Sequence, residues 1–238
     1  MPRNDPLQAT VPEIPNSSLS AVYYGRRRSG DFYDFVSLTP QRVLFGLFDV
    51  AGALPQTRRI MVDLQRNFRN WGTKLLTDEH VSETDSLIKL WILMNRTTTK
   101  SAGGVHACSA FFGCYDDQSG IACYVNAGHT PGIVRHKQSI RELEATALPF
   151  GLFPNAVADA SVVALNPGDA LLLVSKGIAG ASYRGEEYGL QRAGEYLDHS
   201  RGESAHEICV GLLDRLRQFL HAAPTHDDVT ALALVRSA

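Results

Sequence analysis

The sequence predicts an α+β fold, specifically a two-sheet antiparallel β-sandwich flanked by helices. Short strand-like segments occupy both ends of the chain, two helix-like segments follow one another in the middle, and one more helix precedes the last strand. Alternating βαβ units would instead place a helix between successive parallel strands. With 238 residues, of which 44% are hydrophobic and 20% charged, the chain is long enough for one sizeable core.

The first part of the chain predicts a flexible tail followed by strands. Residues 1–18 contain four prolines and many polar side chains, so we expect a flexible N-terminal segment and a packed domain over residues 19–238. Three strand-like segments then follow, separated by turns that contain glycine or proline, and we expect them to form a meander. They cover residues 19–24, 32–38 and 42–50.

Two amphipathic helices are predicted next. Over residues 55–71 the apolar side chains recur at spacings of three and four, as in a helix with one buried face. A second helix begins after Ser82, with Asp85 as a short-acid variant of a capping box, and continues through Met94. We expect the two helices to be adjacent and antiparallel.

Strands return in the second half of the chain. The predicted strands cover residues 106–115, 120–127, 132–136, 161–165 and 170–174. A helix over residues 204–220 and a final strand over residues 229–235 complete the order.

Composition excludes several classes of protein. The formal net charge of -2 gives no general attraction to nucleic acid, and no apolar run reaches the about 20 residues that cross a bilayer. We therefore expect a cytoplasmic protein that binds neither nucleic acid nor membrane. The four cysteines are spaced too loosely for a disulfide framework or a zinc site and are expected to be buried, reduced thiols.

Acidic residues border three of the predicted strands. Asp49 ends an apolar strand, Asp227 and Asp228 open the last one, and Asp31 begins a third. If Asp31, Asp49 and Asp227 converge, their oxygens form a site suited to magnesium or manganese. Taken alone, acids at strand ends are more often turn formers or helix caps than metal ligands.

A series of short motifs occurs in an order that resembles the SpoIIE-like branch of the PPM family, the bacterial relatives of protein phosphatase type 2C. The resemblance extends from about residue 19 to residue 235. Its members are Ser29-Gly30-Asp31-Phe32-Tyr33-Asp34, Asp49-Val50-Ala51-Gly52, Asn126-Ala127-Gly128-His129-Thr130-Pro131, Leu148-Pro149-Phe150-Gly151-Leu152, Asn166-Pro167-Gly168-Asp169, Ser175-Lys176-Gly177 and Asp227-Asp228-Val229-Thr230.

The resemblance implies two divalent metals, Mn²⁺ or Mg²⁺, at one edge of the sandwich. Water bridging them would attack a phosphoserine or phosphothreonine without a covalent enzyme intermediate. By position, Asp49 corresponds to the bridging ligand, the Val50 carbonyl to a backbone ligand, Asp227 to the late ligand, and Asp31 to an acid near the first metal. Asp228 is expected to point to the opposite face, because side chains of a strand alternate.

Three departures affect that implied site. Lys176 stands where the family has a metal-binding aspartate, and at about 4 Å and an effective dielectric near 20 each unit charge pair is worth about 4 kcal/mol. We therefore expect Lys176 to pair with Asp49 and Asp227 in place of the second metal, so these three residues form the altered catalytic set. Gly52-Ala53-Leu54 replaces the usual Gly-His-Gly, and Phe48 replaces a glycine, where its larger side chain is expected to crowd the site.

Two basic positions near these motifs have alternative interpretations. Arg28, in the run Arg26-Arg27-Arg28, is the candidate for holding a phosphoryl group, although three arginines in a turn are also typical of a solvated surface. His129 is expected to form hydrogen bonds within its loop rather than to bind a metal.

Three functions follow from these observations. We favour a pseudophosphatase, a binding or regulatory module that holds one metal or none. The alternatives are an active metal-dependent phosphoserine/phosphothreonine phosphatase and an unrelated α+β binding domain. By analogy alone, the partner expected of the family is a phosphorylated regulatory protein, similar to an anti-sigma-factor antagonist.

Overall fold

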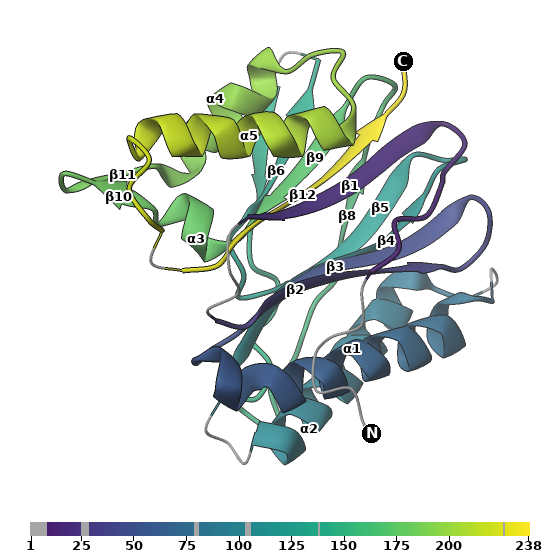
Figure 1. Ribbon diagram of the computed structural model, residues 1–238. Coiled ribbons are helices and arrows are strands. Elements are labelled where there is room, and N and C mark those ends of the chain that lie inside the picture. Colours follow the sequence, from purple (N-terminus) through teal and green to yellow (C-terminus); the bar gives the residue numbers. More distant parts are fainter. Residues whose placement is uncertain (1–8, 25–28, 79–80, 103–105, 138, 226) are drawn as a thin grey trace.

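The computed structural model describes residues 9–24, 29–78, 81–102, 106–137, 139–225 and 227–238. It contains two five-stranded antiparallel sheets packed face to face, with helices on both outer surfaces (Figure 1). The predicted α+β sandwich is therefore confirmed. Among the described residues, no helix is long and apolar enough to cross a membrane.

The first sheet combines both ends of the chain. Its strand order is β1 (Ser17–Tyr24), β12 (Val229–Arg236), β9 (Ala170–Val174), β6 (Gly132–His136) and β7 (Ser139–Leu143). The second sheet has the order β2 (Asp31–Ser37), β3 (Arg42–Val50), β4 (Cys108–Asp116), β5 (Ile121–Ala127) and β8 (Ser161–Ala164).

Helices cover each sheet on its outer face. The second sheet carries α1 (Leu54–Leu76) and α2 (Glu83–Ala102), which pack side by side, and the first sheet carries α4 (Gly189–His199) and α5 (Ala205–Phe219) (Figure 1). A short helix, α3 (Lys176–Ala179), follows β9 directly, and a small hairpin, β10 (Ser182–Tyr183) with β11 (Glu186–Glu187), lies between α3 and α4. The helices α2 and α5 begin where expected. Ser82 Oγ accepts a hydrogen bond from Asp85 N at 3.2 Å before α2, and Ser204 forms a full capping box with Glu207 at the start of α5.

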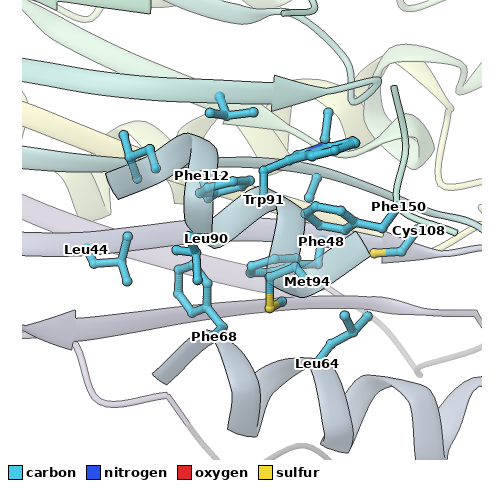
Figure 2. Close-up of a cluster of buried hydrophobic side chains, with 14 of the residues drawn as sticks. Leu44, Phe48, Leu64, Phe68, Leu90, Trp91, Met94, Cys108, Phe112 and Phe150 are labelled. Carbon is cyan, nitrogen blue, oxygen red and sulfur yellow. The ribbon is translucent and has the colours of Figure 1, made fainter. Parts of the chain in front are cut away.

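The alternation of side chains along each strand divides the core into three apolar layers. One layer lies between the sheets, one between the first sheet and α4–α5, and one between the second sheet and α1–α2. Phe48 belongs to the third layer, where its ring stacks on Phe32 at 4.6 Å and meets the edge of Phe68 at 5.0 Å (Figure 2). The expectation that Phe48 crowds the metal site is wrong, because it faces the helices while its neighbour Asp49 faces the other sheet.

Two further predictions need correction. The strand at residues 19–24 does not join a meander with the next two: β1 pairs with β12 in the first sheet, whereas β2 and β3 pair in the second. The predicted flexible segment is packed over its described part, since Ala9 and Ile14 contact the inter-sheet core. Buried Asp117 accepts hydrogen bonds from Asn16 N, Asn16 Nδ2 and Ser17 Oγ at 2.6–3.0 Å and so fixes this segment.

Candidate functional site

The inner face of the second sheet carries two acids at one end of the sandwich. Asp31 is the first residue of β2 and lies directly opposite Asp49, near the end of β3. Phe45 and Leu47 of β3 pack between the sheets, and Asp49 continues that side of the strand. The two carboxylates therefore lie in the seam where the inter-sheet core ends.

Two more acids reach this seam from the loop before β12. Asp228 is buried and accepts hydrogen bonds from Tyr23 Oη at 2.7 Å and from the backbone nitrogens of Ser29 and Asp31 at 3.2 Å. Asp227 is half-buried, and its Oδ1 accepts from Ser29 Oγ at 2.8 Å and from the Asp228 backbone nitrogen at 3.1 Å. Asp228 therefore lies at the same edge and not on the opposite face, contrary to the expectation from strand alternation. We call Asp31, Asp49, Asp227 and Asp228 together the acidic edge.

The first sheet closes the acidic edge through two hydroxyl groups. Thr230 Oγ1 donates to Asp31 Oδ2 at 2.8 Å. Ser175 Oγ donates to the Asp228 carbonyl oxygen at 3.0 Å and accepts from the Thr230 backbone nitrogen at 3.0 Å. Both residues lie within motifs that the sequence singles out, but their supporting role follows only from the pairing of β9 with β12.

Lys176 is placed beside the acidic edge by the turn from β9 into α3. Gly177 is needed there, because a side-chain Cβ at this position would lie 1.9 Å from the Asp228 carbonyl oxygen. Lys176 and Asp227 both line a small cavity of about 130 Å³ beside α3.

The expected ion pairs of Lys176 are not formed in this structure. Lys176 is exposed and makes no ion pair or hydrogen bond through its side chain to any described residue, Asp49 and Asp227 included. A carboxylate held by other donors has less need of the ammonium group: Asp227 already accepts two hydrogen bonds. Lys176 acts on Asp49 only through its electrostatic field.

Burial and neighbouring acids raise the pKa values of Asp49 and Asp31. Burial, followed by the charges of Asp227 and Asp228, raises the pKa of Asp49 to about 6, and Lys176 opposes this rise. Burial, with Asp49 next, also holds the pKa of Asp31 well above its usual value. Among the described residues none donates a hydrogen bond to the Asp49 carboxylate. Asp49 is thus the member of the edge whose charge is least compensated.

The carboxylates of the acidic edge do not fit the pair of metal ions that the resemblance implies. In the described part of the chain, no group of three or more His, Cys, Asp or Glu side chains is arranged to hold a metal ion. Asp228 and Asp31 are engaged by protein hydrogen bonds, and the residue after Ser175 carries a positive charge. Metal binding by Asp31, Asp49, Asp227 and the Val50 carbonyl stays a prediction.

The remaining predicted residues are placed as follows. The Val50 backbone packs against Gly30, where a Cβ would lie 2.0 Å from the Val50 oxygen. His129 is buried, its backbone nitrogen donates to Asn126 Oδ1 at 2.8 Å, and its Nδ1 lies 2.9 Å from Thr130 Oγ1. Burial lowers the pKa of His129 to about 4, so its ring is neutral in a loop fixed by hydrogen bonds, as the sequence predicts.

Arg28, the candidate phosphate ligand, lies outside the described residues. The four cysteines are buried free thiols, as predicted.

Comparisons with known proteins agree with this fold. The family model described as Stage II sporulation protein E (SpoIIE) matches residues 39–237. Protein IcfG from Synechocystis sp. is 29% identical over 129 residues, which amount to 53% of this chain and 20% of that protein. The chain thus matches about a fifth of the length of that relative.

Solved structures share the architecture at low sequence identity. The RsbU and RsbW domains of Rv1364c from Mycobacterium tuberculosis superpose with a TM-score of 0.78 at 22% identity, covering 99% of this chain and 64% of that one. The PP2C phosphatase domain of SpoIIE from Bacillus subtilis, with a fragment of its regulatory domain, gives 0.72 at 18% identity over 93% and 62%. RsbX, solved in complex with magnesium, gives 0.65 at 11% identity over 97% and 100%. The chain therefore belongs to the SpoIIE family, and its fold is that of the PP2C-type phosphatase domains.

Proposed function

We propose that this chain is a pseudophosphatase, a SpoIIE-type domain that binds a phosphorylated regulatory protein without hydrolysing it at the rate of an active family member. The observation that carries the proposal is the ammonium group of Lys176 beside Asp227, at the position where the family resemblance expects a carboxylate. A positive charge there opposes the binding of a divalent cation and removes one oxygen ligand.

The structure around Lys176 supports this proposal in two ways. Three of the four acids of the acidic edge, Asp31, Asp227 and Asp228, are held by protein hydrogen bonds from Thr230, Ser29 and Ser175. Lys176 is exposed and has no ion pair with a described residue, which leaves its three donors available to an incoming phosphoryl group.

The partner is proposed by analogy with the Rsb and SpoIIE structures that share the fold. It is a protein phosphorylated on serine or threonine, and the interaction is expected in the cytoplasm. An active phosphatase is the second candidate. The observation that favours it is that Asp49 and Asp227 are both retained, with Lys176 free to act as a fixed cation toward phosphate beside a single Mn²⁺ or Mg²⁺.

Hydrolysis assays distinguish the two candidates. We expect the purified protein to leave both p-nitrophenyl phosphate and a phosphoserine peptide intact in the presence of Mn²⁺ or Mg²⁺. Lys176→Asp, which restores the carboxylate, is expected to gain metal-dependent hydrolysis, and Lys176→Ala serves as the control for simple loss of the amine. Hydrolysis by the unaltered protein that requires Mn²⁺ and disappears in Asp49→Asn would show that the domain is an active phosphatase.

A further inference from the structure

A second concave site lies between α4 and α5, on the outer face of the first sheet. It is a cavity of about 490 Å³ lined by residues at the start of α4, along α4 and at the end of α5. No residue of the acidic edge lines it. Its volume falls within the range typical of small-molecule sites.

The apolar wall of this cavity is aromatic and rigidly held. The rings of Tyr188 and Phe219 meet edge to face with their centroids 5.4 Å apart. The guanidinium of Arg192 stands 5.0 Å from the centre of the Phe219 ring and donates to the carbonyl oxygens of Glu187 and Tyr188 at 2.6 and 3.0 Å. The wall is therefore preorganised before any ligand arrives.

Two hydrogen-bond donors at the cavity have no hydrogen-bond partner within the part of the chain that the structure describes. Tyr188 is only 3% exposed, yet its hydroxyl makes no hydrogen bond with a described residue. Arg215 is exposed on α5, lines the same cavity and forms no ion pair or hydrogen bond through its side chain within the described ranges. The small exposed part of Tyr188 and the side chain of Arg215 are therefore available to a ligand in the cavity.

Tyr188, Arg192 and Arg215 line the same cavity. Burial raises the pKa of Tyr188, while the charges of Arg215 and then Arg192 oppose that rise. The charge of Glu195 adds to the rise in the pKa of Tyr188. Glu195 Oε1 accepts a hydrogen bond from Gln191 Nε2 at 2.9 Å. Arg192 is ion-paired with Glu186 and Glu195 also lines the cavity, so Arg215 is the guanidinium left without an ion pair to a described residue, which suits a singly charged anion better than a dianion.

We propose that this cavity binds a small aromatic carboxylate, with the ring against Tyr188 and Phe219 and the carboxylate held by Arg215 and the Tyr188 hydroxyl. An aromatic wall in one cavity with a hydroxyl and a guanidinium that have no partner among the described residues is the complement of such a ligand. The site is separate from the acidic edge, and the inference stands whether the domain is a pseudophosphatase or an active phosphatase.

Calorimetric titration with 2-naphthoate tests the site on the full chain. We expect saturable binding at one site, with much weaker binding of 2-naphthamide, which has the same ring without the charge, and of acetate, which has the charge without the ring. Arg215→Gln should weaken 2-naphthoate binding by roughly 10-fold to 100-fold, the usual worth of a hydrogen bond to a charged group. Arg217→Gln, an exposed arginine of the same helix that does not line the cavity, should change it by less than about twofold.

Tyr188→Phe removes the hydroxyl and keeps the ring, so it measures the contribution of the hydroxyl alone. It should weaken 2-naphthoate binding by roughly 3-fold to 10-fold and leave the far-UV circular dichroism spectrum unchanged. Because Arg215 is exposed, its variant decides the question even if Tyr188→Phe folds poorly. The proposal is overturned if 2-naphthoate does not bind, if 2-naphthamide binds equally well, or if Arg215→Gln binds like the unaltered protein.

Discussion

Replacing Asp49 by asparagine removes a charge that destabilises the metal-free acidic edge. The pKa of Asp49 is raised from 3.8 to about 6, chiefly by burial and by Asp227. A shift of about two pKa units corresponds to about 3 kcal/mol between the two protonation states. Because Asp49 is only half-buried and water reaches it, we expect about 1–2 kcal/mol of this to appear as a gain in the free energy of unfolding.

The sign of the effect depends on pH. An acid with a raised pKa in the folded state keeps its proton more readily when folded, so the unaltered protein loses stability as pH rises from about 4 to above 6. Asp49→Asn lacks this loss, and its advantage should be near zero at pH 4 and largest at pH 8. Urea denaturation in the presence of a chelator at several pH values measures it, with Asp214→Asn on the exposed side of α5 as the control. A variant that is less stable than the unaltered protein at pH 8, or equally stabilised at every pH, would refute the reasoning.

Three other substitutions test the packing that supports the site. Gly177→Ala should cost about 1–3 kcal/mol in urea denaturation, because its Cβ would press on the Asp228 carbonyl; an unchanged midpoint would contradict the close approach. Phe48→Ala should cost about 3–5 kcal/mol without changing Mn²⁺ affinity, and a rise in affinity would restore the idea that Phe48 crowds the site. Asp117→Ala leaves the donors of Asn16 without an acceptor, should cost about 1–3 kcal/mol, and should speed proteolysis before β1, which limited digestion would detect.

Periodicity in the sequence was sufficient to predict the long elements of the fold. The helices α1, α2 and α5 and most strands follow the apolar spacing, because each buries one continuous face against a sheet. The sequence did not predict α4, whose apolar residues, among them Ala193 and Leu197, are few and interrupted by glycines. The pairing of β1 with β12 also escaped prediction, since local pattern carries no information about which distant strands become neighbours.

At the site, residue types could be predicted but not their mutual contacts. The order of the motifs indicated that Asp31, Asp49 and Asp227 belong to one edge, and the structure brings them to one end of the sandwich. Two details depended on side-chain direction alone: Phe48 turns to the helices, and Lys176 stays exposed instead of pairing with the acids. Asp227 accepts hydrogen bonds from Ser29 Oγ and from the Asp228 backbone nitrogen, which reduces its need for the lysine as a partner.

Titration of the metal-free protein with Mn²⁺ in a calorimeter addresses the central claim, that the ammonium group at position 176 disables a two-metal centre. The account predicts weak or undetectable binding by the unaltered protein and an affinity at least about 100-fold higher for Lys176→Asp, since attraction replaces repulsion toward a divalent ion. Lys89→Asp, at an exposed position on α2, should leave binding as weak as in the unaltered protein. Tight binding of two Mn²⁺ ions by the unaltered protein, or no gain in Lys176→Asp, would contradict the account.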